Sequence, residues 1–348
     1  MRTYFNTEHA LHRGQKEMFR GEMVPCFEVP DRVDFVLKEL RHRKLGPVET
    51  PEPASLDVLA RTHQPRYLDF LANAWSDWVA LDPANAQRDA FPSYWPIRTF
   101  RSDVVPDSFH ARMGLFSFDA GTPLTSGAWV AARAGAGCAL AGADRLIDGD
   151  RAAFALTRPP GHHAGADFFG GYCFLNNAAI AAQALRDGGA KRVAVLDIDY
   201  HHGNGTQAIF YARGDVFFTS IHGDPRTEYP YFLGHADEHG EGEGLGANFN
   251  LPLSRGTEFI DWRIALAQAL RGIERFGAEA LVVSLGVDTF VQDPISGFRL
   301  RSENYLDVGA DIAGAKLPTL FVFEGGYAVH DVGVNAVNVL QGFNEAAG

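Results

Sequence analysis

Cysteine is scarce in this chain, with three in 348 residues. Cys26, Cys138 and Cys173 cannot form a disulfide framework, and their spacing fits no zinc site built from cysteines. The sequence also lacks an apolar run of about 18 residues, which would predict a membrane span. Residues 1–5 lack the pattern of a signal peptide. We therefore expect a cytoplasmic protein.

Basic residues are outnumbered, since 31 Lys and Arg face 43 Asp and Glu, for a net charge of −12. This balance disfavours nucleic acid as a partner, because such binding needs a basic face. An acidic surface can attract a cationic small substrate, or it can simply keep the protein soluble.

No linker rich in Gly, Ser or Pro and no internal repeat divides the sequence, so we expect a single domain over residues 1–348. Short apolar runs alternate with helical stretches, which predicts an α/β fold with a mainly parallel sheet and helices on both faces. The predicted strands are 152–156, 192–198, 216–221, 280–285 and 319–323. The predicted helices are 127–147, 177–186, 259–276 and 302–315.

Two segments interrupt this alternation. Residues 81–125 are rich in Pro and aromatics and show no helical or strand period, and residues 222–248 are rich in Gly, Glu and His. Loops of this length are usually functional or disordered, and the aromatic content of the first argues against disorder. We expect the 81–125 loop insertion to act as a lid or as the contact of a homodimer. The alternative is an ordinary surface loop without a function of its own.

Polar motifs follow four of the predicted strands. RPPGHH (158–163), DIDYHHG (197–203), GVD (286–288) and EGGY (324–327) each begin where an apolar run ends. Ligands of parallel sheets bind beyond the carboxyl ends of the strands, so these motifs should meet at one edge.

The Asp-x-His pattern of Asp199 and His201 predicts a metal site. Side chains two apart on a strand share a face, and a carboxylate with an imidazole is a typical pair of zinc ligands. Asp288, from another strand end, can supply a third ligand and leave a position for water. Taken alone, the pattern is more often a buried hydrogen-bonded pair, but the other strand-end motifs favour zinc.

His162, His163 and Tyr327 are candidates for proton transfer and oxyanion binding. The histidines follow Pro-Pro-Gly, and their pKa lies near neutrality. Tyr327 follows two glycines, and its hydroxyl could donate to a developing oxyanion.

These motifs resemble those of bacterial acetylpolyamine amidohydrolases, relatives of the zinc histone deacetylases in the arginase/deacetylase superfamily. The matching stretches are RPPGHHAGADFFGGYCFLNN (158–177), VLDIDYHHGNGT (195–206), VVSLGVDTFVQDP (282–294) and EGGY (324–327). The segments around Phe19 and residues 217–225 also look like that branch. The resemblance covers nearly the whole chain and implies the arginase/deacetylase fold.

The resemblance also implies a role for each strand-end residue. The zinc ligands would be Asp199, His201 and Asp288. His163 would be the general base and acid, with His162 as its electrostatic companion held by Asp197, and Tyr327 would donate to the oxyanion.

Further residues are implied for a second ion and for the substrate. A potassium ion near the zinc would be held by Asp197, Asp199, Ser220 and the backbone of His201 and Ile221. Gly171, Tyr172 and Tyr229 would line the acyl channel, and Glu17 would hold a distal amine at its mouth.

The sequence departs from the family at two places. Many deacetylases have an aspartate where this chain has Asn204, and a neutral amide stabilises an imidazolium less, so His163 should be a better neutral base. A carboxylate expected near the channel mouth is replaced by Phe109 and His110, although the long loop also offers Asp103, Asp107 and Asp119.

Deacetylation of small acetylated amines, such as acetylputrescine or acetylcadaverine, is the function that the sequence favours. A protein acetyl-lysine deacetylase is the nearest alternative. A ureohydrolase with two manganese ions would carry an aspartate where Gly286 stands, and a catalytically dead binding module should lack a ligand, the base or Tyr327.

Overall fold

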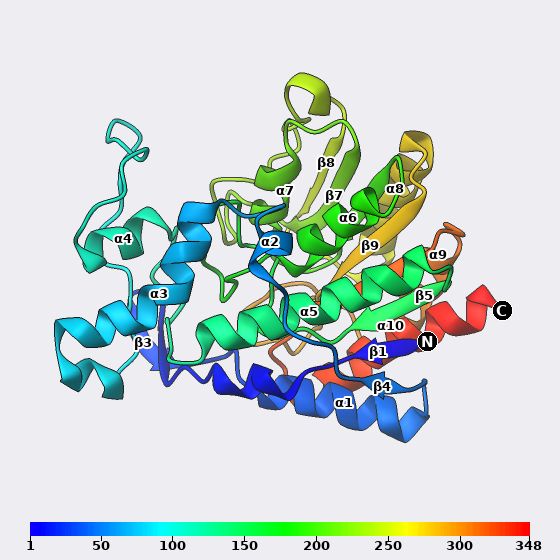
Figure 1. The fold of residues 1–348 in the computed structure, drawn as a ribbon. Helices are drawn as coiled ribbons and strands as arrows, with labels where there is room; N and C mark the ends of the chain where they lie inside the picture. Colours follow the sequence, from blue (N-terminus) through cyan, green and yellow to red (C-terminus); the bar gives the residue numbers. More distant parts are fainter.

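The computed structural model describes residues 1–348 and is organised around one parallel sheet of eight strands (Figure 1). Their order across the sheet is β4-β1-β5-β10-β9-β6-β7-β8. The bounds are β1 Arg2–Tyr4, β4 Val48–Glu49, β5 Ala152–Ala155, β6 Val193–Asp197, β7 Val216–Gly223, β8 Asn248–Leu253, β9 Ala280–Leu285 and β10 Thr319–Phe323. The five predicted strands form the central part of the sheet, so the predicted sheet is confirmed.

Helices cover both faces of the sheet, as predicted. They are α1 Asp31–Arg43, α2 Leu56–Leu59, α3 Pro65–Leu81, α4 Phe109–Leu115, α5 Ala128–Ile147, α6 Asn177–Asp187, α7 Asn204–Phe210, α8 Phe259–Phe276, α9 Asn304–Ala313 and α10 Val332–Ala347. Short 3₁₀ helices are η1 Thr7–Leu11, η2 Pro83–Gln87 and η3 Gly242–Gly244. None of the helices combines the length and apolar character needed to span a membrane.

The two layers follow from the alternation of side chains along the strands. On β9, Leu281 and Val283 pack with α1, α8, α9 and α10, whereas Ala280 and Val282 pack with α5 and α6 on the other face. All six residues of β9 are buried, which is why this strand is a continuous apolar run. The predicted α/β fold is therefore confirmed.

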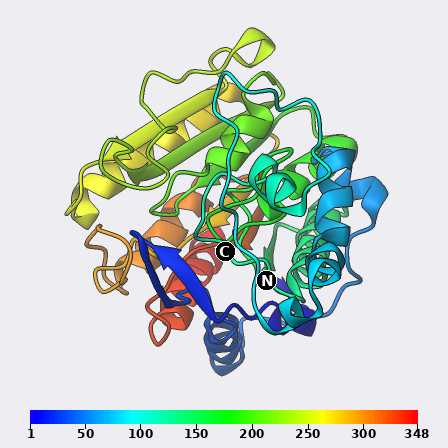
Figure 2. The same cartoon turned by 90° about the vertical axis from the view of Figure 1, so that its left-hand side faces the viewer.

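The outer strands of the sheet and a small hairpin were not predicted from the sequence. β1 and β4 have three and two residues, and β8 includes two asparagines and a proline, so none forms a clear apolar run. β2 (Lys16–Phe19) and β3 (Glu22–Pro25) pair antiparallel outside the main sheet. Figure 1 places β3 and α4 on the same side of the molecule, and Figure 2 views this side.

Residues 81–125 are more regular than expected, since they contain η2 and α4. Phe109, Met113 and Phe116 are buried in a cluster with α3 and α5, because this part of the segment packs onto the domain. Between these helices the chain is irregular, and Tyr94 and Phe100 are more than 60% exposed. The second interruption starts later than predicted, because β7 continues to Gly223.

Candidate active site

The four polar motifs meet at one edge of the sheet. β5, β10, β9 and β6 are consecutive neighbours in the sheet order, and each motif follows the carboxyl end of one of them. Because the strands are parallel, all four motifs emerge at the same edge.

The three predicted zinc ligands lie together. The ligand atoms of Asp199, His201 and Asp288 all lie within 4.8 Å of one another, and all three residues are buried. The His201 Nδ1 atom is 2.8 Å from Asp288 Oδ2 and 3.4 Å from Asp199 Oδ1.

The prediction that Asp199 and His201 share one face of a strand is wrong, because β6 ends at Asp197 and neither residue lies on the strand. The backbone turns its N–H groups onto the carboxylates instead. Asp197 accepts from the N–H of Asp199 (3.1 Å), Asp199 from that of His201 (2.9 Å), and Asp288 from that of Tyr200 (2.8 Å). These hydrogen bonds fix the bend that presents Asp199 and His201 to Asp288.

The electrostatics of this group suit a divalent cation. Burial and the nearby Asp199 carboxylate raise the pKa of Asp288 to about 8. Burial opposes the charge of His201, but hydrogen bonds to Asp199 and Asp288 raise its pKa to about 10. The Asp288 carboxyl and the His201 imidazole thus retain protons that a divalent metal ion would displace, whereas the neighbouring charges lower the pKa of Asp199. Two carboxylates and one imidazole, with a fourth position left for water, are a donor set that catalytic zinc uses.

The adjacent histidines have opposite environments. Their ring centroids are 4.0 Å apart, and His162 Nδ1 is 2.9 Å from Asp197 Oδ2. Burial opposes the charge of His162, but Asp197 and Asp199 raise its pKa to about 10. Burial, then the charges of His162 and His201, lowers the pKa of His163 well below 6.5. His163, which lines the cavity, is therefore the neutral member of the pair and the candidate base.

Asn204 occupies the position that the sequence analysis assigned to it. Its Oδ1 atom lies 2.6 Å from His163 Nδ1, so the amide carbonyl orients the ring without adding a negative charge. His163 then presents its other nitrogen as the free proton acceptor.

Tyr327 lines the same cavity and is held from two sides. Its backbone N–H donates to Asp293 Oδ2 (2.7 Å), and the Arg32 Nε–H donates to the Gly326 carbonyl (2.7 Å). The Arg32 guanidinium also lies 4.8 Å from the centroid of the Tyr327 ring. Gly325 N–H donates to Asp199 (2.8 Å), which ties this loop to the candidate metal ligands.

Arg32 and Asp293 are supporting residues that the sequence analysis missed. Arg32 could have been noticed, because it precedes Val36 and Leu40 at four-residue spacing and thus lies on the apolar stripe of α1. It is fully buried and paired with Glu28 (2.9 Å), which also binds Arg158 (2.8 Å). No comparable periodicity marks Asp293.

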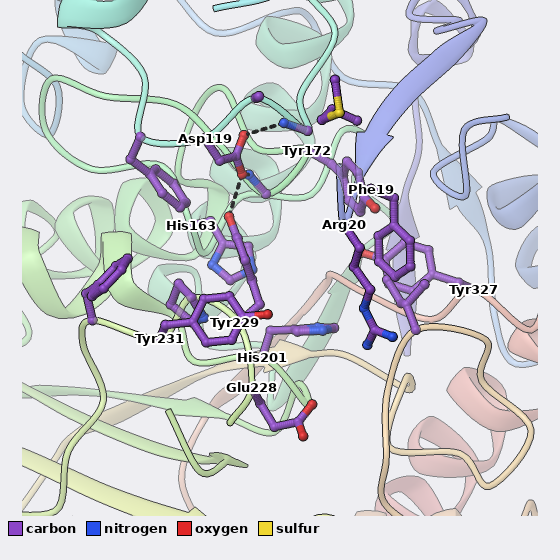
Figure 3. A pocket seen from close by; sticks show the side chains of 18 residues that line it. Phe19, Arg20, Asp119, His163, Tyr172, His201, Glu228, Tyr229, Tyr231 and Tyr327 are labelled. Carbon is purple, nitrogen blue, oxygen red and sulfur yellow. Dashed lines mark hydrogen bonds between the residues drawn. The ribbon is translucent and has the colours of Figure 1, made fainter. Parts of the chain in front are cut away.

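The cavity in front of these groups has a volume of about 370 Å³ (Figure 3). The residues that line it are Met18, Phe19, Arg20, Phe118, Asp119, Ala120, Gly121, His163, Gly171, Tyr172, His201, Glu228, Tyr229, Pro230, Tyr231, Phe232, Ile295 and Tyr327. The three predicted channel residues, Gly171, Tyr172 and Tyr229, are all among them. A side chain at Gly171 would place its Cβ atom 2.2 Å from the His163 ring, so this wall position needs glycine.

Asp119 braces the channel wall. Its Oδ2 atom accepts from the Gly171 N–H (2.7 Å) and the Tyr229 hydroxyl (2.6 Å), and its Oδ1 atom accepts from the Gly121 N–H (3.0 Å). The carboxylate therefore fixes the positions of two channel residues.

Glu17 does not lie where the sequence analysis expected it. It is 1% exposed and lies outside the set of residues that line the cavity. Its carboxylate accepts from the Tyr172 hydroxyl (2.7 Å) and the Phe27 N–H (3.0 Å), because the hairpin turns this side chain inward. Burial raises its pKa to about 7. Glu17 thus supports Tyr172 from behind rather than meeting a distal amine at the mouth.

The side chains expected to bind potassium are neighbours in the sheet. Asp197 of β6 pairs with Ser220 of β7, and Ile221 follows on the same buried strand. The Ser220 hydroxyl lies 2.8 Å from His222 Nδ1. A potassium site here stays a prediction.

Comparison with known proteins identifies relatives over nearly the whole chain. Residues 26–343 match the histone deacetylase domain. The chain is 54% identical over 343 residues to acetylpolyamine amidohydrolase 2 of Pseudomonas aeruginosa, covering 99% of this chain and 98% of the relative. It is 47% identical over 342 residues to the acetylpolyamine amidohydrolase of Mycoplana ramosa, covering 98% and 99%.

A solved structure shows the same architecture. The crystal structure of an acetylpolyamine aminohydrolase from Burkholderia pseudomallei has a TM-score of 0.94 and 39% identity to this chain, and 99% of each chain is covered. The resemblance inferred from the strand-end motifs is confirmed. The chain belongs to the histone deacetylase family and, within it, to the acetylpolyamine amidohydrolases.

Proposed function

We propose that this chain is a zinc-dependent amidohydrolase that removes the acetyl group from small acetylated amines, such as acetylputrescine or acetylcadaverine. The observation that carries the proposal is that one cavity is lined by His163, His201 and Tyr327, with Asp199 and Asp288 buried beside His201. A base, a candidate metal group and an oxyanion donor thus meet where an amide can bind.

Different residues of the cavity have different roles in amide hydrolysis. A bound zinc ion would polarise the amide carbonyl and lower the pKa of the attacking water toward about 7. His163, neutral at rest, takes the proton of the water and returns it to the leaving amine. The Tyr327 hydroxyl donates a hydrogen bond to the oxygen that becomes negative. His162, charged beside Asp197, keeps His163 neutral until the water attacks.

The cavity suits a slender substrate. Aromatic side chains, Phe118, Tyr172 and Tyr229, form its walls, and about 370 Å³ is at the small end for ligand sites. An acetylated aminoalkyl chain fits such a channel. An acetylated lysine side chain on a protein is the alternative, and it would require the mouth to accept the flanking peptide.

A ureohydrolase with two manganese ions is disfavoured by the geometry at Gly286. A Cβ atom there would lie 2.1 Å from Asp199 Oδ2, so this position cannot carry a further carboxylate ligand. The donor set then suits one divalent ion.

The proposal includes a structural potassium ion, held by Asp197, Asp199, Ser220 and the backbone of His201 and Ile221. It also includes a homodimer formed through residues 81–125, where Tyr94, Ile97 and Phe100 are exposed. An apolar group of this kind is typical of a protein contact. A cytoplasmic location remains part of the proposal.

The test combines a metal analysis with a panel of substrates. We expect about one zinc ion per chain and a higher kcat/KM for acetylated small amines than for an acetyl-lysine peptide. A peptide turned over more efficiently than every small amine would contradict the substrate class while leaving the zinc chemistry intact. If the enzyme hydrolyses no acetylated compound, both the substrate class and the zinc chemistry are contradicted.

A further inference from the structure

Residues 222–248, the second segment that interrupts the alternation of strands and helices, contribute one wall of the cavity mouth. Tyr229, Tyr231 and Phe232 lie in this segment and line the cavity. The Tyr229 hydroxyl donates to Asp119 (2.6 Å), and Figure 3 draws Tyr231 beside Tyr229. The rings of Tyr231 and Phe232 are neighbours, with centroids 6.3 Å apart, and Phe232 is 90% exposed. The positions of these two rings therefore depend on how the backbone around them is held.

The backbone of this wall needs support from its surroundings. Tyr231 has a φ angle of 70°, in the left-handed region that residues with a Cβ atom rarely adopt. Such a conformation persists only where neighbouring contacts hold it in place. Gly234, with a φ angle of 105°, follows Phe232 by two residues and is buried, so contacts made there can hold the end of the wall.

The Glu238 side chain holds Gly234 in position. Its Oε2 atom accepts a hydrogen bond from the Gly234 N–H (2.9 Å). The same oxygen accepts from Gln207 Nε2 (2.6 Å) and Asn250 Nδ2 (3.2 Å). On the other side, the His222 Nε2–H donates to the Gly234 carbonyl (2.8 Å). Gly234 is therefore held through both its N–H and its carbonyl.

Gln207 connects Glu238 to the interior of the domain. It lies on α7 and is 1% exposed, and its Oε1 atom accepts from Asn248 Nδ2 (3.1 Å) and Asn250 Nδ2 (2.8 Å) of β8. α7 begins at Asn204, whose side chain orients His163. The wall of the mouth is thus fastened to the same helix that orients the candidate base, through one network of amides and a carboxylate.

We propose that Glu238 is a positioning residue that, through Gly234, holds Tyr231 and Phe232 where they contact the far end of a long acetylated amine. This inference rests on the proposed function, since it concerns how such amines bind. Aromatic faces pack against methylene groups and attract ammonium groups, so a polyamine chain suits this wall. The groups of the cavity floor follow other strands, so Glu238 should affect the binding of long substrates and leave the chemical step unchanged.

The experiment compares a long and a short substrate on the full-length zinc-loaded enzyme. The long one is N-acetylspermine, and the short one is N-propylacetamide, which has no far end to contact the mouth. The measured quantity is kcat/KM for the long substrate divided by kcat/KM for the short one. This ratio removes any general change in the activity or folded fraction of a variant.

For Glu238→Ala we expect the ratio to fall by about threefold to tenfold, because a smaller fraction of molecules holds the wall in its binding position. The fall should come from a higher KM for N-acetylspermine, with kcat unchanged. Glu238→Gln should restore the ratio, because the three donors converge on one oxygen, which an amide oxygen can replace. Glutamine lacks the charge, so recovery also separates positioning from simple attraction of a cationic substrate. Glu241→Ala, at an exposed carboxylate of the same segment outside the cavity, is the matched control and should not change the ratio.

A double-mutant cycle tests whether Glu238 acts through the aromatic wall. Phe232→Ala should itself lower the ratio, because it removes a ring from the mouth. Adding Glu238→Ala to that variant should lower the ratio by less than about twofold, since the contact that Glu238 positions is already lost. If the two changes lower the ratio independently, Glu238 does not act through Phe232 and the inference is wrong.

A ratio for Glu238→Ala within about twofold of the wild type would overturn the inference. So would a fall that Glu238→Gln does not restore, or an equal fall in Glu241→Ala. In each of these cases, hydrolysis of both substrates by the wild type would leave the proposed function intact. If the wild-type enzyme hydrolyses neither substrate, the proposed function fails together with the inference.

Discussion

The floor of the cavity and its mouth are built in different ways. The floor follows four adjacent strands, and its groups are buried and held by short hydrogen bonds, such as that from the Tyr327 N–H to Asp293 (2.7 Å). The mouth is built from the hairpin turn and from residues 228–232, where Arg20 is exposed and Phe232 is 90% exposed. The sheet thus positions the candidate catalytic groups, whereas exposed residues outside the sheet form the mouth.

Of the changes at the cavity floor, removing the proposed general base should lower the rate most. We expect His163→Ala to lower kcat by about 10²–10⁴-fold, the usual contribution of general acid–base catalysis, with bound metal unchanged. His110→Ala, an exposed histidine on α4, is the control and should keep the wild-type rate. Near wild-type turnover by His163→Ala would assign the base to another residue.

Removing one hydroxyl from the floor should have a smaller effect. Tyr327→Phe should lower kcat by about 10²–10³-fold, since it removes a hydrogen bond made to the developing oxyanion, while KM changes little. Tyr94→Phe, in the exposed part of the 81–125 segment, serves as the control. An increase in KM with kcat unchanged would show that Tyr327 binds substrate instead of stabilising the transition state.

A change beside the base should shift the pH dependence more than the rate. The neutral form of His163 accepts the proton, so activity is lost as the pH falls through its pKa, which burial and the neighbouring charges hold well below 6.5. In Asn204→Asp a carboxylate would favour the charged ring and raise this pKa. The acidic limb of the kcat/KM profile should then move up by about one pH unit. If the acidic limb stays in place, a group other than His163 must set it.

Substitutions on the outer surface should change the rate of hydrolysis least. Replacing Ile97 and Phe100 with Ser should shift the proposed dimer toward monomer in sedimentation at micromolar concentration, because both side chains are exposed and apolar. Ile260→Ser, on the exposed face of α8, should not. A wild-type chain that sediments as a fully active monomer would remove the dimer from the proposal.

The fold could be predicted where burial is complete. β6, β9 and β10 are buried along their whole length, so their apolar runs stand out in the sequence. β1, β4 and β8 could not be predicted in the same way, since they are short or carry polar residues at the sheet edge. The helix α4 was missed because seven residues, Phe109–Leu115, are too few to establish a helical period.

In the candidate site, too, some positions could be predicted from the sequence and others could not. The grouping of Asp199, His201 and Asp288 could be predicted from the Asp-x-His pattern and the strand ends, because parallel strands deliver their carboxyl ends to one edge. The position of Glu17 could not, since it depends on how a small hairpin turns its side chains. Arg20 is separated from the candidate metal ligands by more of the chain than any sequence pattern spans, and only the folded hairpin brings it to the cavity.

The central claim, that Asp199, His201 and Asp288 hold a catalytic zinc ion, is tested most directly by metal titration. The chain is stripped with a chelator, and zinc is added back while bound metal and the hydrolysis of an acetylated small amine are measured together. We expect activity to be absent without metal, to rise with zinc and to reach its maximum at about one ion per chain. Asp288→Ala should neither bind the ion nor recover. Full activity in the metal-free chain, or in Asp288→Ala, would contradict this account.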